Sequence, residues 1–297
     1  MKIIVTGSLG NISKPLTKEL VQKGHTVTVI SSKPEREKEI EELGATAAIG
    51  SVEDADFLTS TFTGADVVYA MVPPHDFSDR KVDLMARYRN IGENYVHAIK
   101  QSGVKRLVYL SSVGAHLDKG TGIVLGHHNV EGILNNLSDV DITIMRPAAF
   151  YNNLFGFIDG IKKNGMMASN FGANDKILWV SPKDIAAAIV EEIETLHKGK
   201  KIRYVASDEL TCNEAASVLG EAIGKPDLKW IVIPDEQLLN GLEATGMSKQ
   251  VAAALVEMQA CMHNGKFLED YCNNEPASKG NVKLKDFAKD FAAAFNK

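Results

Sequence analysis

The sequence predicts an α/β fold in which a doubly wound parallel sheet is covered by helices on both faces. Short apolar runs alternate with amphipathic or charged stretches through the first half of the chain, as such a sheet requires. The first apolar run, Ile3–Val5, leads directly into a Gly-x-x-Gly turn and then an amphipathic segment. With 297 residues, 44% of them hydrophobic, the chain suffices for one large domain and a smaller appendage.

The turn after the first strand has the composition of a diphosphate-binding loop. Gly7 permits a sharp exit from the strand, and Gly10 lets the backbone approach phosphates without an intervening Cβ. A turn with a purely structural role is the alternative. We expect the turn to bind a nucleotide through Gly7, Ser8, Gly10, Asn11 and Ile12.

The next elements keep the alternation of strand and helix. Branched residues predict a strand over Thr26–Ile30, and the charged stretch Glu35–Leu43, closed by Gly44, predicts a helix. Ala45–Ile49 is read as a third strand. The apolar run Asp66–Val72 predicts a fourth, which two prolines terminate.

A long helix is then expected from Ser78 to Ser102, ending at Gly103. Arg106–Ser112 predicts a fifth strand, His127–Leu137 a helix and Asp141–Met145 a sixth strand. Together with the turn after the first strand, this order predicts a Rossmann-type sheet.

The alternation loosens after residue 147. Strands are expected over residues 201–205 and 228–233, and Thr211 with Glu214 fits the capping box of a helix that runs to Ile223. Further helices are expected from Pro234 onward, over 248–262 and over 284–295. We predict that residues 1–150 form an NAD(P)-binding Rossmann domain and that residues 151–297 form a smaller α+β C-terminal substrate lobe, from which some strands and helices return to the main domain.

Composition restricts the classes of function. A net charge of −5 argues against general binding to nucleic acids or to membrane surfaces. Three cysteines without a Cys-x-x-Cys pair indicate neither a disulfide framework nor a zinc module, and we expect no metal. No signal peptide precedes the first strand and no apolar run approaches about 18 residues, so a cytoplasmic protein is expected. A homodimer is compatible with the sequence.

An ordered set of motifs resembles the NmrA-like branch of the atypical short-chain dehydrogenases, especially its quinone oxidoreductase and triphenylmethane reductase types. The set comprises the Val5–Gly10 turn, Gly103–Ser112, Glu131 and Arg146–Asn153. The resemblance covers essentially the whole chain and implies a Rossmann-type fold with a C-terminal substrate lobe. Three positions depart from the family pattern: Ser13 replaces the third glycine, Ser32 replaces a phosphate-reading arginine, and Ser51 replaces an acid after the third strand.

Charge at the end of the second strand favours NADP(H) over NAD(H). NAD-specific sites place an acid there to bind both ribose hydroxyls, whereas this chain has Ser31, Ser32 and Lys33. Lys33 would attract the 2′-phosphate that a carboxylate would repel. A solvated loop charge is the alternative role for Lys33.

The residues that usually catalyse carbonyl reduction in short-chain dehydrogenases are missing. The register of their Tyr-x-x-x-Lys pair is occupied by Ile123 and His127. Ser111 ends the fifth strand, where it either binds the nicotinamide ribose or only terminates the strand. By resemblance, His127 is expected to hydrogen-bond the cofactor near its ribose or carboxamide, with a polar surface position as the alternative. Val72, Pro147 and Phe150 complete the expected cofactor contacts.

An aromatic stretch after the sixth strand predicts a pocket for a planar molecule. Phe150, Tyr151 and Asn153 are expected to contact the substrate, with His75 facing them from the fourth strand, and Tyr151 joins His127 as a catalytic candidate. For Phe155 and Phe157, packing in the protein core is the favoured role.

Two functions remain open at this level. The first is an NADPH-dependent oxidoreductase that transfers hydride to a quinone or a similar planar conjugated acceptor, which needs no dedicated tyrosine acid. The second is a non-catalytic NADP-binding redox sensor that acts through a protein partner. The aromatic stretch favours the enzyme, and the missing tyrosine and lysine favour the sensor.

Overall fold

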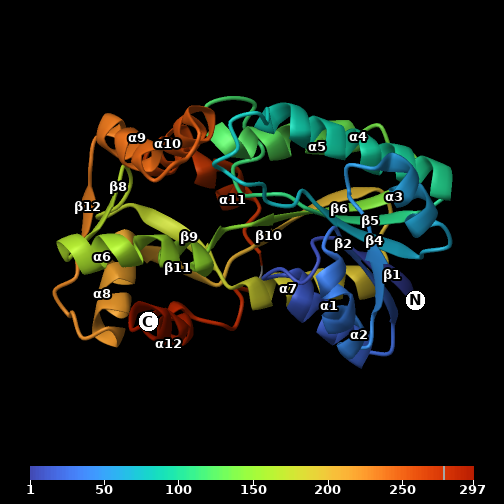
Figure 1. Ribbon diagram of the computed structural model, residues 1–297, viewed down its shortest axis with the longest axis horizontal. Coiled ribbons are helices and arrows are strands. Elements are labelled where there is room, and N and C mark those ends of the chain that lie inside the picture. Colours follow the sequence, from blue (N-terminus) through green and yellow to red (C-terminus); the bar gives the residue numbers. More distant parts are fainter. Residues whose placement is uncertain (277) are drawn as a thin grey trace.

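The computed structural model describes residues 1–276 and 278–297, and it confirms the doubly wound α/β fold (Figure 1). The main sheet consists of seven strands, namely β1 (Lys2–Val5), β2 (Thr26–Ser31), β3 (Thr46–Ile49), β4 (Val67–Met71), β5 (Arg106–Leu110), β6 (Asp141–Pro147) and β10 (Lys200–Val205). All are parallel, in the order β10-β6-β5-β4-β1-β2-β3. The order reverses between β1 and β4, and ligands of such sheets bind at this switch point.

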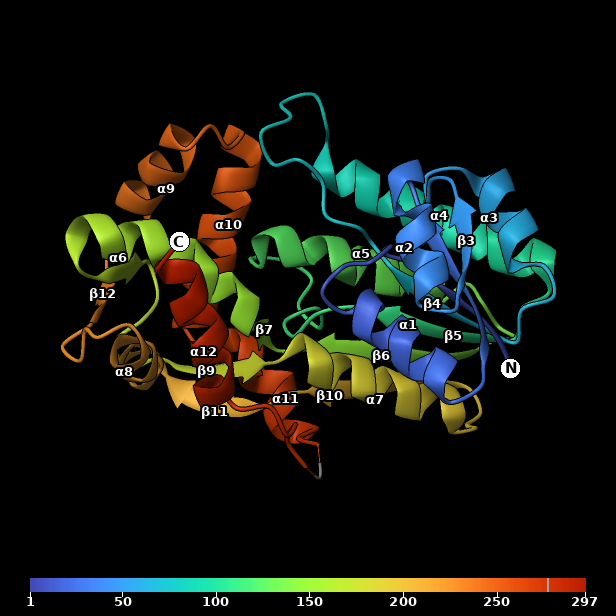
Figure 2. The ribbon, with the colours of Figure 1, turned by 60° about the horizontal axis from the view of Figure 1, so that its bottom comes forward.

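Helices cover both faces of the main sheet (Figures 1 and 2). One face carries α3 (Ala55–Phe62), α4 (Leu84–Ser102) and α5 (Leu125–Leu134), and the other carries α1 (Ser13–Gln22), α2 (Glu37–Glu42) and α7 (Pro182–Glu194). The central strands β1 and β4 are almost wholly apolar because both of their faces are buried, whereas the edge strand β10 carries two lysines and an arginine. In β1, Ile3 and Val5 join the core beneath α1, while Ile4 joins the core beneath α4.

Several predicted boundaries are wrong by a few residues. The helix expected from Ser78 begins at Leu84, because the Asp83 carboxylate accepts a hydrogen bond from the Ala86 N–H (3.0 Å) and caps the helix there. The helix expected over His127–Leu137 begins at Leu125 and ends at Leu134. A short 3₁₀ helix, η2 (Gly122–Val124), precedes it.

Two helices of the main domain were not expected from the sequence. In α3 the Asp54 carboxylate caps the Phe57 N–H, and α7 begins with a Ser181 cap followed by Pro182. The cap residues were the available local signal for both helices. Helix α7 packs beside α1, and β10 follows it as the edge strand of the sheet. One helix and one strand from the second half of the chain therefore belong to the main domain.

The remaining elements form a smaller α+β lobe. Its strands are β7 (Ala149–Phe150), β9 (Lys176–Val180) and β11 (Asp208–Thr211) in one sheet, and β8 (Met167–Ser169) with β12 (Trp230–Val232) in another. Its helices are α6 (Ile158–Asn164), α8 (Cys212–Ala222), α9 (Asp235–Ala244), α10 (Lys249–His263), α11 (Glu269–Asn273) and α12 (Leu284–Phe295), with the 3₁₀ helices η3 (Tyr151–Phe157) and η4 (Lys266–Leu268). The capping box of Thr211 and Glu214 is confirmed. Among the described residues, no helix combines the length and hydropathy that a membrane span requires.

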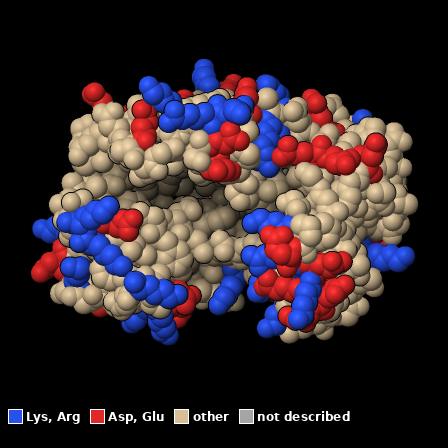
Figure 3. All heavy atoms as spheres, in the orientation of Figure 1, with Lys and Arg blue, Asp and Glu red and all other residues tan. Residues whose placement is uncertain are grey.

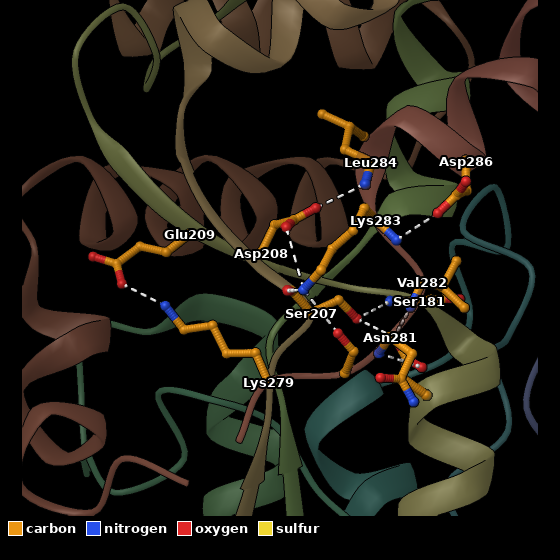
Figure 4. Close-up of polar contacts among 12 residues, drawn as sticks. Ser181, Ser207, Asp208, Glu209, Lys279, Asn281, Val282, Lys283, Leu284 and Asp286 are labelled. Atoms are coloured by element: carbon orange, nitrogen blue, oxygen red, sulfur yellow. Dashed lines mark hydrogen bonds and ion pairs between the residues drawn. The ribbon is translucent and has the colours of Figure 1, made fainter. Parts of the chain in front are cut away.

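The segment before α12 is tied to both parts of the molecule, as Figure 4 shows for residues Lys279 to Asp286. The buried Asp184 carboxylate on α7 accepts hydrogen bonds from the N–H groups of Asn281 (3.1 Å) and Val282 (3.0 Å) and from the Ser207 hydroxyl (2.6 Å). The Asp208 carboxylate accepts from the Leu284 N–H (2.7 Å). These bonds attach the C-terminal segment to the helix that packs beside α1.

Replacing Asp184 should therefore weaken the whole fold. In Asp184→Ala, three donors lose a buried acceptor, and we expect a loss of about 2–4 kcal/mol in the free energy of unfolding. Glu209→Gln is the matched control, because it removes only exposed ion pairs with Lys279 (3.0 Å) and Lys176 (3.7 Å) and should change stability by less than about 1 kcal/mol. Urea denaturation measures both. Equal losses in the two variants would contradict this account of the segment.

Candidate functional site

The predicted cofactor residues lie along one edge of the main sheet. The turn from Gly7 to Ile12 follows β1, Ser32 and Lys33 follow β2, Val72 follows β4, Ser111 follows β5, and Pro147 ends β6. Because all of these strands are parallel, their carboxyl ends share one edge. Figure 3 shows the surface hollowed beside this region, between the α9–α10 pair and the part of the lobe that carries α6 and β9.

The turn after β1 is held in a conformation that exposes backbone donors. Gly7 and Ser8 both have positive φ (86° and 54°), and the Ser8 N–H bonds to the Ile30 carbonyl (3.1 Å). Successive residues in such conformations form anion-binding concavities. Within residues 1–276 and 278–297, no acceptor bonds to the N–H groups of Asn11, Ile12 or Ser13, and the first turn of α1 carries no acid.

The two glycines of the turn have different roles. A Cβ at Gly7 would overlap the Met71 thioether and lie 2.7 Å from the Ser13 hydroxyl, so this position is closed by the protein itself. A Cβ at Gly10 would meet only the Gly7 carbonyl, at 3.1 Å, and otherwise face open space. Ser13 fits in place of the family's third glycine because its hydroxyl donates to the Thr6 carbonyl (2.8 Å) at the end of β1. The residues therefore fit a diphosphate above Gly10.

The basic side chains near the end of β2 differ in whether they form ion pairs. Ser32 and Lys33 are exposed, and the described residues contain no carboxylate paired with Lys33. Glu39 on α2 binds both Lys14 (2.7 Å) and Arg36, and these charges lower the pKa of its carboxyl group. Lys33 is thus the cation of this group that is free to meet an anion.

His127 lies in the first turn of α5 between two tyrosines. Its ring meets Tyr88 edge-on, with centroids 5.1 Å apart, and its Nδ1 lies 3.2 Å from the Tyr109 hydroxyl. This packing removes water from the ring and lowers the pKa of His127 to about 4. The imidazole is therefore neutral at pH 7 and serves as a hydrogen-bonding group rather than as a cation.

Ser111 belongs to a buried ionic network that the sequence did not reveal. Its hydroxyl donates to Glu131 (2.5 Å), which in turn binds Arg146 through both carboxylate oxygens (3.0 and 2.6 Å). Arg146 also binds Asp270 (2.8 Å) and Tyr204 (3.0 Å). Burial alone would lower the pKa of Arg146, but Glu131 outweighs it and raises the pKa above the usual range. Two motif residues of the family resemblance, Glu131 and Arg146, thus bind each other.

The position of the missing tyrosine is covered by α10. Gly122, next to Ile123, packs so closely on α10 that a Cβ there would overlap the Ala254 carbonyl and lie 2.9 Å from the Met258 nitrogen. The side chain of Ile123 is only partly exposed, in contact with both cores of the sheet.

Other partly exposed apolar side chains pack against the core on this face of the sheet, and some of them lie on α10 and η4. They include Leu9, Met71, Leu117, Phe150, Met258 and Met262. Three of these are methionines, whose flexible thioethers adapt to ligands of varied outline. The two on α10 are remote in sequence from the motifs, and no local signal marked them.

Tyr151 requires a correction. Its side chain is fully buried in the lobe, its ring stacks on Phe287 (centroids 5.5 Å apart) and its hydroxyl donates to Asp208 (2.6 Å). Burial and the adjacent Asp208 raise the pKa of the phenol well above its usual range. With ring and hydroxyl both engaged inside the lobe, we remove Tyr151 from the site.

The other predicted substrate contacts are dispersed. His75 is half-buried with Nε2 3.5 Å from Asp79, Asn153 is exposed on η3, and Phe150 is half-buried in β7. Phe155 and Phe157 pack on lobe aromatics, with centroids 5.0 Å from Phe287 and 4.6 Å from Trp230, respectively. In the described part of the chain, no three His, Cys, Asp or Glu side chains gather as metal ligands would.

Comparison with known proteins identifies the family. The model of the NmrA-like family matches residues 1–287. The chain belongs to the NmrA-like family. This NmrA-like chain is 24% identical to the (4-alkanoyl-5-oxo-2,5-dihydrofuran-3-yl)methyl phosphate reductase of Streptomyces griseus over 226 residues, which is 75% of this chain and 74% of that protein. It is 29% identical to anthocyanidin reductase of Arabidopsis thaliana over 141 residues, 43% of this chain and 42% of the relative.

Solved structures share the fold over nearly the full length. The NADPH complex of the NADPH-dependent quinone oxidoreductase QOR2 from Escherichia coli superposes with a TM-score of 0.80 at 20% identity, covering 97% of this chain and 99% of the other. The NADP(H) complex of triphenylmethane reductase from Citrobacter sp. also gives 0.80 at 20% identity, covering 98% and 99%. The expected Rossmann-type fold of the NmrA-like chain is thereby confirmed.

The geometry of the turn predicts how glycine substitutions separate binding from folding. Gly10→Val should abolish dinucleotide binding, because the side chain would occupy the diphosphate position, while stability stays within about 0.5 kcal/mol of the parent. Gly7→Ala should instead destabilise the fold, since it forces a Cβ against Met71 at a positive φ. Gly132→Val, on the exposed surface of α5, is the control for an added valine. Calorimetry with NADP⁺ and thermal unfolding check all three, and retained affinity in Gly10→Val would refute the assigned turn.

Proposed function

We propose that the protein is an NADPH-dependent oxidoreductase that transfers hydride to a quinone or a similar planar conjugated acceptor. Membership of the NmrA-like family, together with the open donor-rich turn above Gly10, carries the proposal. Two relatives are named as reductases, and two structural neighbours were solved with NADPH or NADP(H). When bound, the cofactor would supply the hydride, and this chain's residues would bind and orient it.

The preference for NADPH rests on the end of β2. Ser31 is buried and its hydroxyl accepts from the Lys33 N–H (3.2 Å), which orders the short segment that presents Lys33. None of the three residues Ser31, Ser32 and Lys33 is acidic, so this segment contains no carboxylate that would repel a 2′-phosphate. Lys33 would form the charge-assisted contact.

The nature of the acceptor follows from what surrounds the expected nicotinamide position. The partly exposed hydrophobic side chains that pack against the sheet core near this edge include three methionines, which suits a flat, polarizable molecule. Ile123 offers no proton, and His127 is neutral at pH 7. A conjugated acceptor matches this setting because its developing negative charge is delocalised and needs orientation more than a strong acid.

The redox sensor remains the second candidate. The observations that favour it are the missing tyrosine and lysine of the usual catalytic pair and the half-buried, apolar Ile123 that stands in the tyrosine's register, on a 3₁₀ helix packed against α10. One relative, the photosystem II assembly factor Ycf39 of Synechocystis sp., is 21% identical over 65% of this chain and 59% of its own length, and its name is not that of a reductase. A sensor would bind NADPH without oxidising it and would need a protein partner.

Steady-state assays separate the two functions. We expect NADPH oxidation with quinones and triphenylmethane dyes, followed by the loss of nicotinamide absorbance, and His127→Ala should slow it about 10- to 100-fold by removing an orienting hydrogen bond. His263→Ala, at an exposed position on α10, is the matched control. Tight NADPH binding without oxidation of any acceptor in the panel would contradict the enzyme hypothesis and favour the redox sensor.

Cofactor choice provides a further prediction. Lys33→Glu should weaken NADPH binding by about 1.5–3 kcal/mol, roughly 10- to 150-fold, and leave NADH binding much less affected. Lys38→Glu makes the same change of net charge on α2, where Lys38 is exposed beside Glu42 (3.9 Å), and should have a small effect. Calorimetry with both cofactors measures the difference. Equal losses for NADPH and NADH in Lys33→Glu would exclude a 2′-phosphate contact.

A further inference from the structure

The contact between Tyr109 and His127 determines which nitrogen of His127 carries hydrogen. Tyr109 is fully buried on β5, and the described residues offer its hydroxyl no hydrogen-bond partner other than His127 Nδ1, at 3.2 Å. Burial raises the pKa of Tyr109 well above its usual range, so the phenol keeps its proton.

A buried hydroxyl is satisfied when it donates its hydrogen. No carbonyl or carboxylate of the described chain hydrogen-bonds to this hydroxyl, so its available acceptor is Nδ1 of His127. An Nδ1 that accepts must be unprotonated, and a neutral imidazole then carries its hydrogen on Nε2. The low pKa of His127, about 4, keeps the ring in this neutral form at pH 7.

The other nitrogen is available to a ligand. Among the described residues none hydrogen-bonds to His127 Nε2, and this atom is not enclosed by protein. His127 lies one helical turn after Ile123, at the carboxyl edge of the sheet. An Nε2–H there can only donate, so its ligand must present an oxygen or another acceptor.

We propose that Tyr109 is a positioning residue that holds His127 in the Nε2–H tautomer, so that His127 donates a hydrogen bond to an oxygen of the bound ligand. The inference deepens the proposed function and rests on it for the identity of the ligand. The oxygen belongs either to the cofactor, at its nicotinamide ribose or carboxamide, or to the acceptor. The tautomer itself is a property of the free protein.

The neighbouring histidine supplies an internal control. His128 Nδ1 lies 3.0 Å from the Ala115 carbonyl, which can only accept, so Nδ1 of His128 must carry the hydrogen. Two adjacent histidines in one helix are therefore expected in opposite tautomers.

Long-range ¹H–¹⁵N spectra of the full-length protein, labelled at histidine, measure this directly. His127→Gln and His128→Gln assign the two rings. In the parent protein we expect an unprotonated Nδ1 for His127 and a protonated Nδ1 for His128. In Tyr109→Phe the ring of residue 109 is retained, the donor is lost, and His127 should become a mixture of tautomers. His128 should not change.

Tyr88→Phe is the matched control, because Tyr88 contacts the His127 ring edge-on and its hydroxyl makes no hydrogen bond within the described chain. Its His127 signals should keep the parent pattern. A protonated Nδ1 in the parent, or an unchanged tautomer in Tyr109→Phe, would overturn the proposal.

Ligand titrations then identify the oxygen. A shift of the His127 Nε2–H signal on adding NADP⁺ alone assigns the cofactor, and a shift that appears only when duroquinone is added to the NADP⁺ complex assigns the acceptor. No shift with either would overturn the donor role. Tyr109→Phe should also lower kcat about fivefold with little change in the KM for NADPH. If no acceptor is ever reduced, the proposed function fails, whereas the tautomer and its dependence on Tyr109 are still decided by the spectra.

Discussion

One backbone-to-backbone contact governs the geometry of the cleft. Where η2 meets α10, the chain approaches so closely that only a glycine fits at position 122. The contact brings an element of the C-terminal lobe over the carboxyl edge of the sheet, together with Met258 and Met262. The next residue, Ile123, stands in the register of the missing tyrosine and is half-buried.

The environment of His127 is also poor in polar groups. Tyr88 and Tyr109 remove water from the imidazole, and a pKa near 4 makes protonation at pH 7 cost about 4 kcal/mol. A histidine in this environment is a poor general acid and a good fixed donor. Such a group contributes orientation, which is what hydride transfer to a delocalised acceptor requires. In the proposed reductase, these residues would therefore support a narrower range of reactions than a tyrosine-dependent carbonyl reductase does.

The main sheet was predictable because its information is local. Each strand from β1 to β6 is a short apolar run, and the turn at Gly7–Gly10 fixed the sheet type and the ligand edge. The sequence analysis did not identify which segments of the second half return to the main domain. The local sequences of α7 and β10 do not indicate that the helix packs beside α1 or that the strand pairs with β6. The role assigned to Tyr151 was not supported for a related reason. The sequence does not show whether an aromatic residue after a strand faces a cleft or packs inside the lobe, as Tyr151 packs on Phe287. The contribution of α10 depends on contacts between residues more than 100 positions apart.

The motif residues divide into two groups by what they touch. The turn after β1 carries N–H groups, at Asn11 to Ser13, to which no acceptor of the described residues bonds, as a phosphate-binding turn requires. Glu131 and Arg146 instead complete each other, with Asp270 of α11 as a third member. Burying such charges is costly, and removing one partner would leave the other uncompensated at about 3–5 kcal/mol. The network therefore contributes geometry more than net stability: it joins α5, β6 and α11 behind Ser111. The network ties Ser111, directly after β5, to the second half of α5, the helix that carries His127 beside Tyr109.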